Sequence, residues 1–379
     1  MMSGPRVAVV LDGGGARAAY QVGLLRVLAR HFPRLRLSVV CGVSAGAINA
    51  AYLANHTGSF AQAVEGLAKL WSSLTADQIF RADALNLALG LLRSGAALLS
   101  AGRLRSSGTR SMVSTAPLRR LLTRELHATA AGRLTGVTAN LAHGSLDAVA
   151  LVTINYATGD TVSWVQGHGI TAWQRPNRCA LRTELGVEHV MASAALPLFF
   201  PAVRIGDSWY GDGGVRQAAP LAPAIHLGAE RIIAVSTRYV GTSLETAQRE
   251  PHPYPPPAQI LGVLFDSIFL DSLDWDAHVL ERVNRLLRWV PPGERDGLRP
   301  IDLFVLRPSA DLGALASQRE PQLPYAFRFL MRGLGTRESE SPAALSMLMF
   351  EPGFIAEVIR AGEVDAEKRI DELASLVGP

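Results

Sequence analysis

The serine with the most reactive setting in this sequence is Ser44, which lies in the pentapeptide Gly42-Val-Ser-Ala-Gly46. A G-x-S-x-G pentapeptide between a strand and a helix is typical of a nucleophile elbow, a sharp turn that exposes a serine hydroxyl. Gly42 and Gly46 allow close backbone approach because they have no Cβ, and the amino end of the next helix favours negative charge. Such a pentapeptide also arises by chance among small residues, so its strand–helix context carries the catalytic interpretation.

A second candidate element is the loop Asp12-Gly-Gly-Gly-Ala-Arg17, which follows the first apolar run. Consecutive glycines at a strand-to-helix turn can aim several backbone amides at one point, as an oxyanion hole requires. The same loop matches a dinucleotide-binding fingerprint, in the form Gly13-x-Gly15-x-x-Ala18. That fingerprint expects an acidic residue about 20 positions further on, but no Asp or Glu occurs between Asp12 and Glu65. We therefore interpret the loop as an oxyanion hole.

The candidate base lies much later in the chain, in the run Asp212-Gly213-Gly214. A carboxylate within hydrogen-bond reach of a serine can accept its proton and later activate water. Asp-Gly-Gly by itself is a routine turn signal. Three histidines, His226, His252 and His278, could instead complete a triad in the order Ser, acid, His. None of the three lies in a comparable turn, so a carboxylate paired directly with the serine is preferred.

These side chains need a framework of buried strands, and the sequence has the pattern for one. Arg6–Leu11 and Leu35–Cys41 are short apolar runs rich in β-branched residues, which is typical of parallel strands buried on both faces. Helical patterns follow them, over Ala18–Leu28 and Ala45–Ala54. Alternation of this kind predicts an α/β fold in which helices cover both faces of a mostly parallel sheet.

Similar runs predict further strands in the rest of the chain. These are Ala148–Asn155, Thr161–Val165, Ala202–Ile205, Arg231–Val235 and Ile301–Leu306, while helical patterns dominate Phe60–Leu126 and Gln259–Val290. If the last strand joins the same sheet, residues 239–299 are a mostly helical excursion, and residues 309–379 form a helical C-terminal part. We therefore expect one domain over residues 1–379, with the core motifs in residues 6–235.

The order and spacing of the three motifs resemble those of the patatin-like phospholipases. A fourth segment, Ala192-Ser-Ala-Ala-Leu-Pro-Leu-Phe-Phe-Pro201, is similar to the small-residue and proline segment ahead of Asp-Gly-Gly in that family. The resemblance covers residues 6–235, with weaker similarity at residues 301–308. It implies a three-layer α/β/α fold with a central mostly parallel sheet, a Ser-Asp dyad without a catalytic histidine, and no metal or organic cofactor.

The resemblance also implies a role for each motif. Ser44 would attack the carbonyl of a phospholipid, lysophospholipid or simpler ester, and Asp212 would take its proton. The oxyanion would be received by the glycine loop, whose members are Gly13, Gly14, Gly15, Ala16 and Arg17. Arg17 either supports this loop or meets the substrate phosphate, and both interpretations stay open.

Three alternatives to a Ser-Asp lipid hydrolase stay open. An acyltransferase and a Ser-His-Asp esterase both use the same serine motif, but each requires a histidine beside it. A non-catalytic lipid-binding protein would need neither partner, and the presence of both Ser44 and Asp212 argues against it. The neighbour of Ser44 in the fold, either a histidine or Asp212, distinguishes these classes.

Composition narrows the kind of partner. The chain has 379 residues, of which 48% are hydrophobic and 18% charged, so it can bury a sizeable core. The net charge is only +4, and the densest basic patch, Arg103–Arg124, contains no aromatic residue. This pattern argues against nucleic-acid binding. The two cysteines, Cys41 and Cys179, form neither a disulfide framework nor a metal site.

The hydropathy pattern bears on the membrane. No stretch reaches the roughly 18 uncharged apolar residues that a membrane span requires, and Met1–Pro5 lacks the features of a signal peptide. We therefore expect a cytoplasmic protein. The apolar segment Ala84–Leu92 is either a lid that contacts a membrane surface or a core helix. Gln259–Leu273 is a second candidate for membrane contact.

Overall fold

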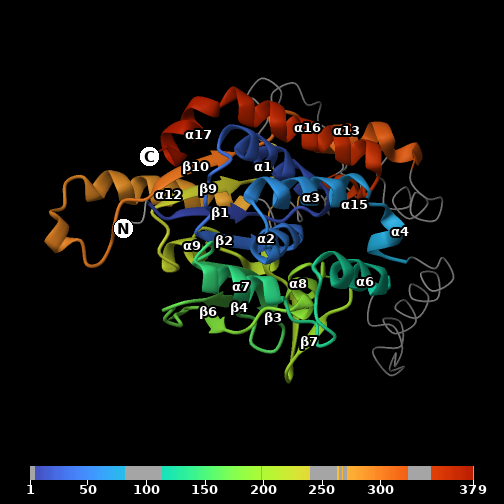
Figure 1. Cartoon of the computed structure of the whole chain (residues 1–379), viewed down its shortest axis with the longest axis horizontal. Helices are drawn as coiled ribbons and strands as arrows, with labels where there is room; N and C mark the ends of the chain where they lie inside the picture. The colour runs from blue at the N-terminus through green and yellow to red at the C-terminus, as the bar shows by residue number, and fades with distance from the viewer. Residues whose placement is uncertain are drawn as a thin grey trace, which may run out of the picture.

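The computed structural model describes residues 5–81, 113–197, 199–239, 263, 267, 271–322 and 343–378. In this part of the chain, helices cover both faces of one central sheet (Figure 1). Three segments singled out in the sequence lie wholly or mostly outside the described residues: Ala84–Leu92, Gln259–Leu273 and His252. The basic patch Arg103–Arg124 is described only from residue 113 onward.

Five parallel strands form one half of the sheet. In spatial order they are β10 (Asp302–Leu306), β9 (Arg231–Val235), β1 (Val7–Leu11), β2 (Val39–Val43) and β3 (Ala148–Asn155). The predicted strand at residues 301–306 is therefore confirmed as a member of this sheet. Strand β2 begins four residues later than the sequence predicts, since a surface turn at residues 33–34 is followed by irregular backbone as far as Ser38.

Beyond β3 the sheet becomes mixed. Strands β4 (Thr161–Gly167) and β8 (Ser208–Asp212) pair antiparallel with β3, and β7 (Val203–Ile205) pairs with β8. Strands β6 (Arg178–Arg182) and β5 (Gln174–Arg175) follow β4 at the edge. The hairpin of β3 and β4 is as predicted, whereas β8 is not: the sequence indicates only a turn at Asp212, but this residue ends a strand.

The helices divide between two faces according to the alternation of side chains along β1. Val7, Val9 and Leu11 face a core built with α1 (Ala19–His31), α2 (Ala45–Asn55), α3 (Phe60–Ser72) and α16 (Pro352–Lys368). Ala8 and Val10 face a smaller core built with α9 (Ala222–His226) and α12 (Asp271–Leu287). Successive residues of a strand point to opposite faces, so a strand apolar at every position needs helices on both sides. The predicted three-layer α/β/α fold is confirmed.

The remaining helices surround this framework. They are α4 (Ala76–Ile79), α6 (Ala116–Glu125), α7 (Thr135–His143), α8 (Val187–Ser193), α13 (Leu312–Arg319), α15 (Ala343–Leu348) and α17 (Ile370–Val377), with short 3-10 turns η1 (Gly15–Ala18), η2 (Gly213–Arg216), η3 (Pro292–Glu294) and η4 (Glu320–Gln322). None of the described helices is both long and apolar enough to cross a membrane.

Helix α16, in the C-terminal part of the chain, crosses α1 with the two backbones in close contact. A Cβ at Gly23 would lie 2.2 Å from the carbonyl oxygen of Ile359, and a Cβ at Gly362 would lie 2.2 Å from that of Tyr20. Arg26 pairs with Glu363 at 2.7 Å beside this crossing. Two glycines thus let the backbones touch, and this contact fixes the last part of the chain to the first helix (Figure 1).

We predict that Gly23→Ala destabilises the protein by about 1–3 kcal/mol, because the added methyl collides with helix backbone that cannot move aside cheaply. The measurement is the free energy of unfolding in denaturant. Gly293→Ala is the matched control, since nothing lies within 4 Å of a Cβ at that position. Equal stabilities of the two variants would contradict the tight crossing.

Candidate active site

The two candidate catalytic residues are brought together by one strand. Strand β3 pairs with β2 as far as Val152, which lies opposite Val43, and its next residue, Thr153, lies opposite Asp212 of β8. The other edge of β3 is occupied by β4 over the same residues. Strand β8 therefore continues along the edge that β2 leaves. This register places Asp212 at the end of β2, where Ser44 follows.

Ser44 occupies a strained turn between β2 and α2. Its φ is 56° and its ψ is −130°, a conformation that costs a non-glycine residue free energy and that is concentrated at functional sites. The flanking glycines are needed for space: a Cβ at Gly42 would lie 2.4 Å from the carbonyl oxygen of Gly46, and one at Gly46 would lie 2.2 Å from that of Leu11. The predicted strand–turn–helix context of the pentapeptide is confirmed.

Ser193 is hydrogen-bonded to this turn. The amide of Ser44 donates a hydrogen bond to Oγ of Ser193 at 3.0 Å, and that hydroxyl donates to the carbonyl oxygen of Val152 at 2.6 Å. Ser193 is fully buried at the end of α8. Sequence patterns assign Ser193 no individual role, although it lies in the small-residue segment that contributes to the family resemblance.

Asp212 is fully buried beside this turn. Its Oδ1 accepts a hydrogen bond from the amide of Gly214 at 2.9 Å. Gly213 is packed against β3, where a Cβ would lie 2.5 Å from the carbonyl oxygen of Val152. Burial raises the pKa of Asp212 to about 7, although the interactions with the Ser44 hydroxyl and the Gly214 amide lower it. Its Oδ2 has no hydrogen bond of normal geometry among the described residues. The Ser44 hydroxyl is therefore near enough to lower the pKa of Asp212 but does not form a well-aligned hydrogen bond with it.

The glycine loop between β1 and η1 faces Ser44. A Cβ at Gly13 would lie 3.1 Å from the Cβ of Ser44, and Gly14 and Gly15 have φ values of 133° and 57°. Within the described part of the chain, the amides of Gly14 and Gly15 donate to no protein acceptor. The amide of Gly13 differs, because it donates to Oδ1 of Asp12 at 2.8 Å. Two unpartnered amides thus follow directly after the glycine that lies against the serine.

Asp12 is a second buried carboxyl near the site. Burial, and the negative charges of Asp212 and Asp274, raise its pKa to about 8, against the lowering effect of the Gly13 amide. Its Oδ2 has no hydrogen-bond partner among the described residues. The sequence singled out Asp12 only as the start of the glycine motif, because burial of the side chain is a consequence of the sheet.

A chain of buried amide groups connects the glycine loop to α3. Nε2 of Gln21 donates to the carbonyl oxygen of Asp12 at 2.6 Å, and its Oε1 accepts from Nδ2 of Asn49 at 2.8 Å. Oδ1 of Asn49 in turn accepts from the indole nitrogen of Trp71 at 2.7 Å. All three side chains are buried. Buried polar networks that are fully satisfied fix the groups they join, and sequence patterns gave no signal for this one.

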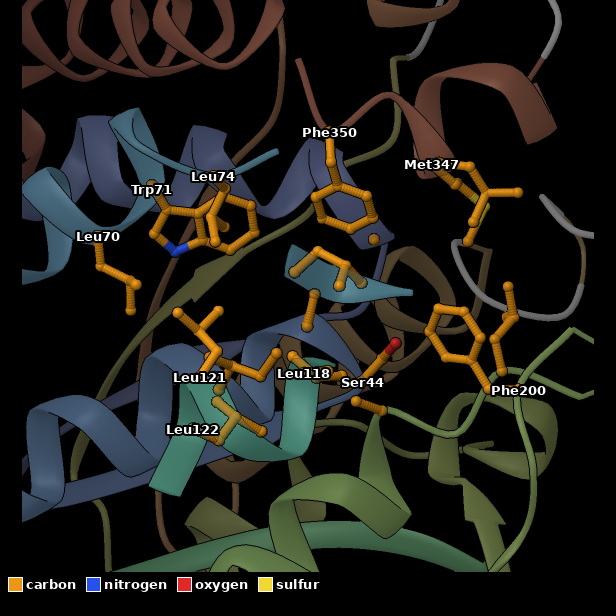
Figure 2. Close-up of a pocket in the computed structure, with 17 residues that line it drawn as sticks. Ser44, Leu70, Trp71, Leu74, Leu118, Leu121, Leu122, Phe200, Met347 and Phe350 are labelled. Carbon is orange, nitrogen blue, oxygen red and sulfur yellow. The ribbon is translucent and has the colours of Figure 1, made fainter. Parts of the chain in front are cut away.

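An apolar cavity opens beside Ser44 (Figure 2). Apart from the Ser44 hydroxyl and the indole of Trp71, its side chains are hydrocarbon or thioether. The lining residues are Gly15, Ser44, Ala45, Ile48, Leu70, Trp71, Leu74, Ile79, Leu118, Leu121, Leu122, Ala194, Leu196, Phe200, Met347, Leu348 and Phe350. Figure 2 shows Leu70, Trp71, Leu121 and Leu122 toward one end of it, and Phe200 and Met347 on the side of the Ser44 hydroxyl. The lining suits an apolar group whose reactive end lies at the serine.

The histidines in the described part of the chain lie elsewhere. His226 stacks on Trp173, with ring centroids 4.7 Å apart, near the amino end of β1, where Arg6 also lines its pocket. His278 is exposed on α12 next to Trp275. His189 is buried, and its Nδ1 accepts a hydrogen bond from the amide of Gly186. No histidine of the described residues lines the cavity, and these residues include no cluster suited to a metal ion.

The fold and site together define an α/β protein with a strained strand-to-helix turn at Ser44 and an adjoining apolar cavity. A sequence profile described as patatin-like phospholipase matches residues 9–225, more than half of the chain. The chain therefore belongs to the patatin-like phospholipase family. No curated protein sequence matches it significantly.

Several solved structures are similar to the chain over 98% of its length. VipD from Legionella pneumophila has 13% identity, a TM-score of 0.41 and 67% of its own length covered. Human GIVD cytosolic phospholipase A2 has 11% identity, a TM-score of 0.48 and 60% of its own length covered. The type III effector protein ExoU has 14% identity, a TM-score of 0.38 and 53% of its own length covered. The chain thus spans about half to two thirds of the length of these proteins.

We predict that Asp12→Asn changes how stability depends on pH. Between the usual carboxyl pKa of 3.8 and about 8, the folded chain keeps a proton on Asp12 that the unfolded chain releases. The free energy of unfolding therefore decreases as pH rises through this range. An amide does not ionise, so the thermal unfolding midpoint of the variant should rise relative to that of the wild type as the pH increases from 5 to about 9.

Thermal unfolding at several pH values measures this effect. Asp207→Asn is the control for removing a charge at the surface, since the side chain of Asp207 is fully exposed. A difference between Asp12→Asn and the wild type that stays constant with pH would show that Asp12 titrates as it does in the unfolded chain.

Proposed function

We propose that this protein is a serine hydrolase that cleaves acyl esters of lipids through a dyad of Ser44 and Asp212. The observation that carries the proposal is the position of Ser44: it lies on a strained turn between a buried carboxyl and a cavity lined almost wholly by apolar side chains. Membership of the patatin-like phospholipase family supports the same activity.

The reaction follows from the groups around the serine. Oγ of Ser44 attacks the ester carbonyl while its proton passes to the carboxylate of Asp212. The amides of Gly14 and Gly15 stabilise the oxyanion, and the proton then passes to the departing alcohol. Water, deprotonated by Asp212, then attacks the acyl-serine. The proton returns from Asp212 to Oγ of Ser44 as the ester bond breaks, which releases a carboxylic acid and free Ser44. Gly13 contributes close approach rather than a donor, because Asp12 already occupies its amide.

The cavity favours a lipid over a small polar ester. Burying a methylene is worth about 0.8 kcal/mol, and the cavity lies directly beside Ser44. An acyl chain bound there would leave its carbonyl at the serine and its head group outside. The proposed substrates are therefore phospholipids, lysophospholipids or simpler lipid esters. An acyltransferase or a Ser-His-Asp esterase is disfavoured, because no histidine among the described residues lines this cavity.

We predict that Ser44→Ala abolishes hydrolysis of a phospholipid and p-nitrophenyl ester panel and also abolishes labelling by a fluorophosphonate probe. Asp212→Asn should lower kcat by at least about a hundredfold, because the amide cannot accept the proton. In the wild type kcat/KM should decrease as pH falls below about 7, where Asp212 becomes protonated.

The matched controls are His226→Gln and His278→Gln, which should retain the wild-type kcat because both side chains lie away from the cavity. A histidine variant as inactive as Ser44→Ala, with Asp212→Asn still active, would replace the dyad by a triad. Labelling that persists in Ser44→Ala would reject the assignment of the nucleophile.

We also predict that Leu121 limits the length of the acyl chain that fits the cavity. Leu121→Ala should raise kcat/KM for longer esters relative to shorter ones by about three- to fourfold for each further methylene buried, and Leu121→Phe should shift the preference toward shorter chains. The measurement is kcat/KM over a series of p-nitrophenyl esters. Leu286→Ala is the control, because Leu286 is 66% exposed on α12. An unchanged preference in both Leu121 variants would place the acyl chain elsewhere.

A further inference from the structure

The glycine loop is held by two segments that lie outside the family-matched residues 9–225. One is Thr237, directly after β9, and the other is the C-terminal segment Leu345–Phe350, which includes most of α15. Both segments are buried. Glycines gain conformational freedom from the missing Cβ, so a loop with three of them needs contacts from elsewhere to keep its amides in one direction.

Thr237 holds the first part of the loop. Its Oγ1 donates a hydrogen bond to the carbonyl oxygen of Gly13 at 2.8 Å. A Cβ at Gly14 would lie 2.3 Å from this Oγ1 of Thr237. The threonine side chain therefore fills the space where a residue larger than glycine would project. It also restrains the peptide unit that carries the Gly14 amide, because the Gly13 carbonyl and the Gly14 N–H belong to the same peptide.

The C-terminal segment holds the second part of the loop. Nε of Arg17 donates a hydrogen bond to Oγ of Ser346 at 2.6 Å, across 329 positions of sequence. Both side chains are buried. Arg17 belongs to the 3-10 turn η1, which begins at Gly15, so a contact on its guanidinium restrains the turn that carries the amides.

The neighbour of Ser346 touches the loop backbone directly. A Cβ at Gly15 would lie 2.1 Å from the carbonyl oxygen of Met347. Met347, Leu348 and Phe350 then continue into the wall of the apolar cavity (Figure 2). One short segment therefore packs against the loop that carries the proposed oxyanion donors and also lines the space proposed for the acyl chain.

We propose that Ser346 is a positioning residue, which holds the oxyanion loop in its catalytic arrangement through Arg17. This inference rests on the proposed hydrolase function. A charge-assisted hydrogen bond is stronger and shorter than a neutral one, and oxyanion stabilisation depends on donors that are oriented before the reaction. Arg17 is thus assigned the supporting role rather than contact with the substrate phosphate, and the C-terminal segment is part of the active site.

The test compares Ser346→Ala with Ser317→Ala. The control removes the hydroxyl of Ser317, which is partly buried, donates to the carbonyl oxygen of Gly313 within α13 and lies outside the site. For a p-nitrophenyl ester, Ser346→Ala should lower kcat by about ten- to a hundredfold, since small misplacement of catalytic groups has effects of this size. KM should change by less than about twofold, because the cavity wall is unaltered. Ser317→Ala should match the wild type in both constants.

A double-mutant cycle separates positioning from general damage to the fold. If Ser346 acts through Arg17, then adding Ser346→Ala to Arg17→Ala causes no further loss of kcat. A second loss of the same size in the double variant would overturn the proposal, as would a rise in KM with an unchanged kcat, or wild-type kinetics in Ser346→Ala.

The wild type and Ser44→Ala are measured in the same assay. Activity that depends on Ser44 but not on Ser346 rejects the positioning role alone. Activity that is absent from the wild type, or unaffected by Ser44→Ala, rejects the hydrolase function and the positioning role together.

Discussion

The arrangement of the site depends on the division of one edge of β3 between two strands. Its first five residues pair with β2, and its last three pair with β8, which approaches from the opposite direction. Strand β4 blocks the other edge, so the end of β2 and the end of β8 must meet. Backbone hydrogen bonds allow only registers that keep the alternation of faces. The proximity of Ser44 and Asp212 is therefore a property of strand pairing, and it needs no direct bond between the two side chains.

Burial then sets the electrostatics of the site. Asp212 ends β8 and Asp12 directly follows β1, and both side chains are buried. Among the described residues no cation is a main influence on the pKa of either carboxyl. A buried carboxyl without a cation favours its neutral form, which moves the pKa of Asp212 to about 7, close to the value that a general base needs near neutral pH. The cost is that its Oδ2 stays without a well-formed partner in the free protein. Such unsatisfied groups lower stability.

The contacts that support the site come from the whole length of the chain. Ser193 fixes the serine turn, Thr237 fixes the start of the glycine loop, and Ser346 contacts its end through Arg17. The close crossing of α1 and α16 brings the C-terminal segment back to the first helix. We propose on this basis that the described parts form a single domain, with residues 309–322 and 343–378 completing the site rather than forming a separate unit.

The sequence by itself determined the layers of the fold and the location of the motifs. Apolar β-branched runs predicted β1, β3, β9 and β10 to within a residue or two, because strands buried on both faces have a distinctive composition. The glycines marked both tight turns, since close backbone approach excludes other residues. Tertiary structure alone decided the rest. Strand β8, the burial of Asp12 and the contact of Ser346 with Arg17 all depend on which distant segments meet. Local patterns carry no information about such contacts, because pairing across hundreds of residues is set by the packing of the whole chain.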